Sequence, residues 1–347
     1  MNKKKKTTIS DIAKELNVTP STVSRALGNH PRISDSTKKA VWDMVEKLNY
    51  QPNNIASALR KGKSNIIGVI VPTSDRQFFA SFIRGIEEIV RDEGYNLMIC
   101  QSDDQYSKER SGIDTLLNIR VDGIIASVAK ETTEFSHYEK VKKQGVPLVL
   151  YDRVIESLDV NLVVSDDFLG AYKGVSHLIE QGCTRIAHFA GQQHIQIYQK
   201  RLEGYLQALR EHNIPVDNNI IIESDLIRDK YRILQTSREM TKKLLEMPNM
   251  PDGIFSSSDF AAIGAIKILK EKNVKIPDEI ALVGYSNDFS ASMIEPSLTS
   301  LDQHTLEMGN LAAKHFLSQM ENPENFTQIK TKLKPKLIVR ESSLRKS

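Results

Sequence analysis

The sequence predicts an α/β protein: a small all-α domain at the N-terminus, followed by two lobes built on parallel sheets. From residue 66 onward, short apolar runs of strand length alternate with amphipathic stretches of helix length. Continuous apolar strands separated by helices are typical of parallel sheets covered on both faces. The runs form two series: 66–71, 96–100, 123–127, 147–151 and 161–165, then 185–190, 219–223, 253–257 and 280–285.

The length and composition limit the class of protein. The chain has 347 residues, 40% of them hydrophobic, which allows two or three domains with a large core. No apolar run reaches the length of a transmembrane helix, and the basic start lacks the apolar segment of a secretory signal. Cys100 and Cys183 lie far apart in apolar contexts, which indicates buried thiols. We therefore expect a cytoplasmic protein.

The charge is unevenly distributed. Residues 1–63 hold 13 Lys and Arg against 5 Asp and Glu, while the whole chain has a net charge of only +3. Lys3–Lys6 supply half of this local excess, so a solubilising tail is one explanation. A basic small domain joined to a mildly acidic large one is also the pattern expected if only the first part meets a polyanion.

Capping residues delimit three helices in the basic segment. Thr8 with Asp11 fits a capping box, Thr19 precedes a proline at the first helical position, and Ser34 begins a third helix. The first two helices, joined by a tight turn, predict a helix-turn-helix, whose second helix lies in the major groove of DNA.

The second of these helices has the composition of a recognition helix. Its apolar face is Val23, Ala26 and Leu27, which leaves small hydroxyl side chains and Arg25 outside. Small side chains let a helix approach a groove, and Arg binds guanine through two hydrogen bonds. A short polar helix in an ordinary bundle is the alternative. The DNA-binding candidates here are Thr8, Thr19, Pro20, Ser21, Thr22, Ser24, Arg25, Asn29 and Ser34.

Three blocks of this segment resemble the LacI/GalR family of bacterial transcription regulators: "TISDIAKELNVTPSTVSRALG", "ISDSTKKAVWDMVEKLNYQPN" and "ASALRKGKSNIIGVIVP". The resemblance continues to the C-terminus through "RIAHFAG", "RLEGY", "IALVGYSND" and "LIVRESS". It implies a two-lobed periplasmic-binding-protein-like domain whose small-molecule effector controls the affinity for operator DNA. It also implies a hinge helix over residues 54–60, ordered when two subunits sit together on an operator. The DNA-binding residues of the hinge segment would be Asn53, Ala56 and Leu59, with Leu59 as a minor-groove wedge.

The expected domain organisation follows from these patterns. The helix-turn-helix headpiece spans residues 1–52, the hinge helix and linker 53–65, and the effector-binding and dimerisation domain 66–347. Within the last, we expect lobe 1 at about 66–162 and 295–325, and lobe 2 at about 163–294 and 326–341.

The effector site is expected beyond the carboxyl ends of the strands, where ligands of open α/β sheets bind. Carboxylates, an arginine, amides and two phenylalanines follow the predicted strands, and together they suit a polyhydroxyl molecule. By position, the resemblance implies effector-contacting or pocket-shaping roles for some of them. The candidates are Ser74, Phe78, Phe79, Asp152, Arg201, Ser258, Asp259, Ser286 and Gln303. Asp259 opens a helix and so could be partly structural.

The chain departs from the family pattern at several positions. Ser258 and Ser286 stand where members often carry amide or acidic residues, and the stretch 224–240 is longer than usual. That stretch holds the basic residues Arg228, Lys230 and Arg232. These departures argue against a purine or a simple galactoside. They leave open a phosphorylated or acidic sugar, with a plain surface loop as the alternative explanation of the stretch.

The sequence indicates no cofactor and no enzyme. It has no Gly-x-Gly-x-x-Gly after the first strand, no phosphate-binding loop and no His/Cys metal set. A helix-turn-helix protein with a sugar-processing enzyme domain is the alternative. The expected partners are double-stranded operator DNA, a sugar-like effector and a second copy of the chain. No leucine heptad follows Arg340, so we expect a dimer. The sign of the control, induction or co-repression, stays open.

Overall fold

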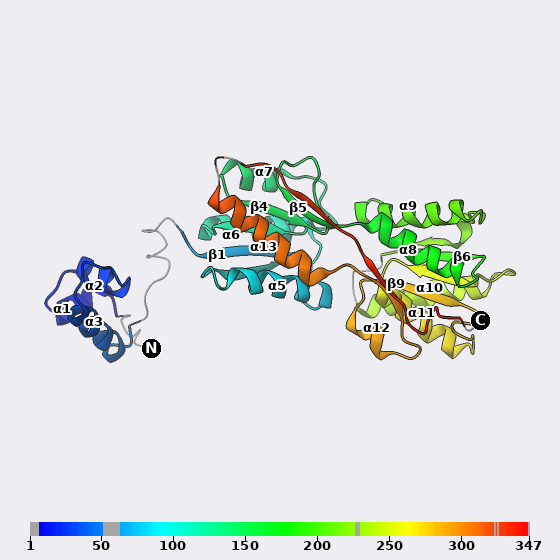
Figure 1. Cartoon of the computed structure of the whole chain (residues 1–347), viewed down its shortest axis with the longest axis horizontal. Helices are drawn as coiled ribbons and strands as arrows, with labels where there is room; N and C mark the ends of the chain where they lie inside the picture. Colours follow the sequence, from blue (N-terminus) through cyan, green and yellow to red (C-terminus); the bar gives the residue numbers. More distant parts are fainter. Residues whose placement is uncertain (1–6, 51–62, 226–229, 323, 325, 346–347) are drawn as a thin grey trace. The chain divides into compact units, whose positions relative to one another are not determined.

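The computed structural model describes residues 7–50, 63–225, 230–322, 324 and 326–345, with the backbone alone for 230–232. The chain divides into two compact units, Met1–Ser64 and Asn65–Ser347 (Figure 1). Within the described ranges, no helix is long and apolar enough to cross a membrane.

The N-terminal unit contains the three predicted helices. They are α1 (Ile9–Glu15), α2 (Pro20–Leu27) and α3 (Asp35–Lys47). Each has the cap that the sequence predicts. The Thr8 hydroxyl accepts from the Asp11 amide in a full capping box, and the hydroxyls of Thr19 and Ser34 accept from the amides three residues later. The helices enclose a small core that includes the completely buried Ile12, Val23 and Val41.

The second unit holds two six-stranded sheets, and all nine predicted apolar runs form strands in them. The strand order of the first sheet is β11-β5-β4-β3-β1-β2, and every pair is parallel. The order of the second is β12-β10-β9-β8-β6-β7, with β12 antiparallel to β10. We call the two sheets with their helices lobe 1 and lobe 2.

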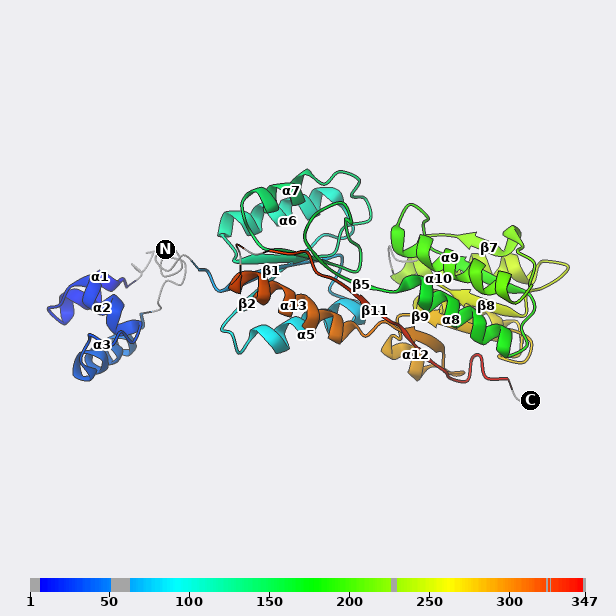
Figure 2. The same ribbon diagram turned by 45° about the horizontal axis from the view of Figure 1, so that its top comes forward.

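Lobe 1 is covered by helices on both faces of its sheet. Its strands are β1 (Ile66–Val71), β2 (Asn96–Gln101), β3 (Gly123–Ala126), β4 (Leu148–Tyr151), β5 (Asn161–Ser165) and β11 (Lys330–Leu333). Its helices are α5 (Gln77–Val90), α6 (Tyr106–Ile119), α7 (Ser136–Lys143) and α13 (Thr305–Glu321). Successive side chains of β1 point to opposite faces of the sheet: Val69 packs with α5 and α13, and Ile70 packs with α6 and α7. These two pairs of helices lie on opposite faces of the sheet (Figure 2).

Lobe 2 repeats this arrangement. Its strands are β6 (Ile186–Ala190), β7 (Ile221–Glu223), β8 (Gly253–Ser256), β9 (Ala281–Tyr285), β10 (Thr299–Asp302) and β12 (Lys336–Ile338). Its helices are α8 (Asp167–Glu180), α9 (Gln196–Glu211), η1 (Asn218–Ile220), α10 (Lys230–Leu245), α11 (Asp259–Glu271) and α12 (Phe289–Met293). One core cluster joins the sheet to α8 and α9, and another joins it to α10 and α11.

The chain crosses between the lobes three times, from β5 to α8, from β10 to α13 and from β11 to β12 (Figure 1). The crossings correct the lobe boundaries expected from the sequence. β10 lies in 295–325 but pairs with β9 in lobe 2, and β11 lies in 326–341 but pairs with β5 in lobe 1. β5 also stays in lobe 1 to Ser165, beyond the expected boundary at residue 162. β10 to β12 are short and partly polar, and they join their sheets through pairing partners distant in sequence, which local patterns do not reveal.

Candidate functional site

The first candidate site is the outer face of α2. Ser21 and Arg25 are exposed, and Thr22 and Ser24 are half-buried, while Val23 and Ala26 point into the core. Packing of the apolar side therefore presents the hydroxyls and the guanidinium to solvent, as the sequence predicts.

The other headpiece candidates lie around this helix. Thr8, Thr19 and Ser34 are exposed residues that cap the three helices. Pro20 is the first residue of α2, and Asn29 follows its end with a left-handed φ of 51°. The predicted hinge helix with Asn53, Ala56 and Leu59 lies outside the described residues.

The second candidate site is a cavity between lobe 1 and lobe 2. Seven of the nine predicted effector residues line it: Phe78, Phe79, Asp152, Arg201, Ser258, Ser286 and Gln303. The two phenylalanines come from the first turn of α5, Arg201 from α9, and the rest directly follow β4, β8, β9 and β10. This is the arrangement expected at the carboxyl ends of parallel strands.

Two of the predicted effector residues do not line the cavity. Ser74 is exposed, and both its amide and its hydroxyl donate to Gln101 Oε1 at 3.0 Å, at the end of the edge strand β2. The Asp259 side chain is buried behind the cavity, where it accepts from Ser300 Oγ at 2.6 Å and from the Asp288 amide at 2.7 Å. Asp259 thus holds the start of α11 against β10 and against the loop after β9.

Arg201 is fixed by partners of its own lobe. Its Nε donates to Asp167 Oδ1 at 2.8 Å and its NH1 donates to the Ser257 carbonyl at 2.9 Å. The guanidinium carbon also lies 3.7 Å from the centre of the Tyr285 ring. Burial alone would lower the pKa of Arg201, but the Asp167 carboxylate and the Tyr285 ring raise it above its ordinary value, so the side chain stays charged.

The lobe 1 side of the cavity carries a second ion cluster, after β4. Arg153 NH1 lies 2.6 Å from Asp104 Oδ1, and Arg153 Nε lies 4.0 Å from Asp152 Oδ2. Asp152 adopts a left-handed φ of 56°, a conformation that Asp tolerates better than most residues. Burial raises the pKa of Asp152 to about 6 in spite of the neighbouring arginine.

Other lining residues were not among the sequence-based candidates: Pro72, Arg76, Asp104, Arg153, Ile197, Ser257, Phe260 and Asp288. The rule that located Asp152 also applies to Asp104, which follows β2 as Asp152 follows β4. Arg76 is harder to find, because its guanidinium carbon reaches across the cavity to 5.3 Å from the Phe260 ring centre of the other lobe.

Three buried polar atoms of lining residues have no hydrogen-bond partner among the described residues. They are the amide nitrogen of Gln303, which is 2% exposed, the hydroxyl of Ser257 and Nε of Arg153. Unpaired polar groups in a buried place are costly, so a ligand with hydroxyl groups gains by pairing with them. Within the described part of the chain, no group of three or more His, Cys, Asp or Glu could hold a metal ion.

Comparison with known proteins finds a family match for each part of the chain. Residues 8–53 match the model of bacterial regulatory proteins of the lacI family, and residues 175–343 match that of a periplasmic binding protein-like domain. A curated ribose operon repressor from Halalkalibacterium halodurans is 32% identical over 97% of each chain. The chain belongs to the LacI family. Another relative, the HTH-type transcriptional regulator DegA of Bacillus subtilis, is 32% identical over 97% of this chain and 98% of its own.

Among solved LacI-family structures, a transcriptional regulator from Enterococcus faecium with bound ribose is 28% identical. It matches with a TM-score of 0.70 over 81% of this chain and 100% of its own. The curated relatives therefore match nearly the whole chain, and this structure matches most of it.

Proposed function

We propose that the protein is a transcriptional repressor that binds an operator as a homodimer through α2, and that a sugar in the cavity between the lobes controls its DNA affinity allosterically. The observation that carries the proposal is the combination, in one LacI-family chain, of a capped helix-turn-helix and a cavity lined by both aromatic and charged side chains. No enzymatic step is part of this proposal.

The exposed face of α2 supports the DNA-binding part. Arg25 is exposed on a helix whose neighbouring side chains are small, so the helix can enter the major groove far enough for the guanidinium to reach base edges. Two such headpieces, related by two-fold symmetry, would read two half-sites, which is the reason to expect a homodimer.

The charge balance of the cavity supports a neutral sugar. Arg153 is paired with Asp104, Arg201 is paired with Asp167, and Arg76 shares the lining with the carboxyl groups of Asp152 and Asp288. The arginines are thus available as directional donors to hydroxyl groups without leaving a net positive charge that an acid or a phosphate would need. Phe78 and Phe79 can cover the apolar face of a sugar ring. Among the relatives, the ribose operon repressor and the ribose-bound regulator make D-ribose the first probe.

The test combines DNA selection with a ligand screen. The full-length protein selects a sequence from a random duplex library, and fluorescence anisotropy measures its affinity with and without each sugar. The screen contains D-ribose, other pentoses and hexoses, and the corresponding acids and phosphates. We expect an enriched palindromic sequence, and a neutral sugar that changes both the thermal midpoint and the DNA affinity. Failure to enrich any DNA sequence would refute the proposal that the protein is a sequence-specific regulator. Failure of every sugar to bind would refute the proposal that a sugar is its effector.

A further inference from the structure

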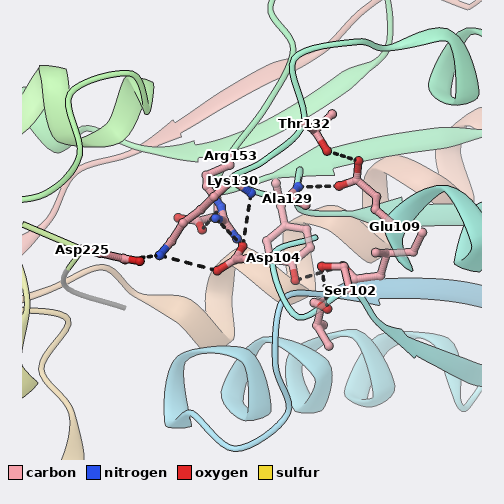
Figure 3. Close-up of polar contacts among 12 residues, drawn as sticks. Ser102, Asp104, Glu109, Ala129, Lys130, Thr132, Arg153 and Asp225 are labelled. Carbon is pink, nitrogen blue, oxygen red and sulfur yellow. Dashed lines mark hydrogen bonds and ion pairs between the residues drawn. The ribbon is translucent and has the colours of Figure 1, made fainter. Parts of the chain in front are cut away.

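A buried lysine of lobe 1 forms an ion pair with a carboxylate of lobe 2. Lys130 Nζ lies 2.8 Å from Asp225 Oδ1, and the lysine side chain is only 6% exposed (Figure 3). Lys130 follows β3 in lobe 1, and Asp225 follows β7 in lobe 2. The pair therefore spans the opening between the lobes, away from the three crossings of the chain.

The backbone around Lys130 is rigidly held. The buried carboxylate of Glu109, in α6, accepts from the Ala129 amide and, at 2.7 Å, from the Thr132 hydroxyl. The Lys130 amide donates to Asp104 Oδ1 at 3.3 Å, and the Glu131 amide donates to the Asp104 carbonyl at 3.2 Å. The lysine thus projects from a fixed loop, so less backbone entropy is lost when its ammonium meets Asp225.

The same carboxylate connects this ion pair to the cavity. Asp104 Oδ2 lies 3.8 Å from Lys130 Nζ, while Asp104 Oδ1 lies 2.6 Å from NH1 of Arg153, which lines the cavity (Figure 3). Lys130 is therefore placed between an anion of its own lobe and an anion of the other lobe. Any shift of Arg153 toward a ligand changes how strongly Asp104 attracts Lys130.

Burial makes the ion pair depend on lobe closure. Desolvation lowers the pKa of Lys130, and Asp104 and Asp225 oppose that shift. A buried ammonium that loses one of its two carboxylates must regain water or stay poorly compensated. Separation of the lobes removes Asp225, so the ion pair favours the closed arrangement.

We infer that Lys130 and Asp225 form an inter-lobe clamp that sets the balance between closed and open lobes, and that Asp104 couples the clamp to the cavity through Arg153. The inference rests on the proposed function, because it describes how the proposed effector site is regulated. Lys130 and Asp225 are then positioning residues. Their ion pair holds the two lobes together, and other residues of the cavity bind the ligand.

The direct test measures the distance between the lobes in the full-length protein without ligand. Spin labels are placed on cysteines at the exposed positions Thr133 of lobe 1 and His194 of lobe 2, with Cys100→Ala and Cys183→Ala in the background. Unlabelled chain is added in excess, so that only distances within one chain are measured by double electron–electron resonance.

The variants are Lys130→Gln, Asp225→Asn and the double variant. Asp225 is 30% exposed, so Asp225→Asn tests the clamp even if Lys130→Gln impairs folding. The matched control is Lys142→Gln with Asp159→Asn, an exposed ion pair at 3.0 Å within lobe 1. We expect both single variants to shift the distribution to longer distances, the double variant to shift it no further than the larger single shift, and the control to leave it unchanged.

The ligand measurement separates the clamp from the proposed function. Where D-ribose binds the wild type, Asp225→Asn should raise its dissociation constant about fivefold or more. A wild type that binds no sugar refutes the effector proposal, while the distance measurement still tests the clamp. Distance distributions that stay unchanged in both single variants, or shifts that add fully in the double variant, would overturn the clamp.

Discussion

Arg201 and Asp167 form an ion pair at the lobe 2 side of the cavity in which neither side chain is more than 6% exposed. α9 supplies the arginine and α8 the carboxylate, and the closest oxygen lies 2.7 Å from NH2. Arg201, which we propose as a binding residue, is thereby also part of the contact between α8 and α9, so we expect its substitution to affect stability as well as binding.

Arg201→Met should destabilise the second unit by about 3–5 kcal/mol, because it leaves the Asp167 carboxylate buried without its partner. The companion variant Arg201→Met with Asp167→Leu removes both charges and should recover part of that loss. Urea denaturation followed by circular dichroism measures both. If the double variant is less stable than Arg201→Met alone, the unpaired Asp167 carboxylate is not the cause of the destabilisation.

Arg25→Ala should weaken binding to the selected DNA by about 1–3 kcal/mol and relax the preference at one base pair. The physical reason is the loss of a guanidinium that can donate two hydrogen bonds to a guanine. Anisotropy titrations against the selected duplex and its single-base variants measure this. Lys47→Ala, which removes an exposed cation from α3, serves as the control and should leave the base preference intact.

Thr19→Ala should destabilise α2 locally by about 1 kcal/mol, since the Thr22 amide loses its acceptor at 3.1 Å. Hydrogen exchange of the peptide containing residues 20–27 would show faster exchange. Thr19→Ser keeps the hydroxyl and should restore protection, and Ser21→Ala, next to the cap, should change little. Equal exchange in Thr19→Ala and wild type would mean that the cap does not stabilise the helix.

The pKa of Asp152 gives the second unit a specific dependence on pH. The folded value of about 6 lies above the ordinary 3.8, so between these two values the folded chain holds a proton that the unfolded chain releases. The free energy of unfolding therefore receives a contribution that is full below about pH 4 and is lost as the pH rises to about 6.

Asp152→Asn removes this titration, and Asn also tolerates the left-handed backbone at this position. Compared with the variant, the wild type should lose about 1–3 kcal/mol of stability between pH 4 and 6. Asp259 has a raised pKa of about 6 as well, so Asp259→Asn is measured in parallel to separate the two contributions. Identical pH profiles of wild type and Asp152→Asn would show that folding does not raise the pKa of this carboxyl group.

The features that could be predicted from the sequence are those that depend on residues close together in the chain. The caps at Thr8, Thr19 and Ser34 depend on residues three positions apart, and the apolar strands depend on their own composition, so both could be located without tertiary information. The placement of Asp152 and Gln303 in the cavity follows from one general rule, that the carboxyl ends of parallel strands meet at one edge.

The remaining features depend on distant pairings. Ser74 follows β1, so the rule about the carboxyl ends of strands also predicted it in the cavity. Its hydroxyl instead donates to Gln101, at the end of the neighbouring strand, outside the cavity. The local sequence around Lys130 does not predict a function for it, because its ion-pair partner, Asp225, lies 95 residues away in the sequence. The strands β10 and β11 likewise become recognisable only once β9 and β5 are in place beside them.

The three crossings of the chain between the lobes, which follow from the placement of β10 in lobe 2 and β11 in lobe 1, have a mechanical consequence. With a single connecting segment, one lobe could twist, slide or bend relative to the other. Three segments attached at separate points restrict twisting and sliding and favour bending about one axis. A molecule bound in the gap then acts mainly on that one bending motion.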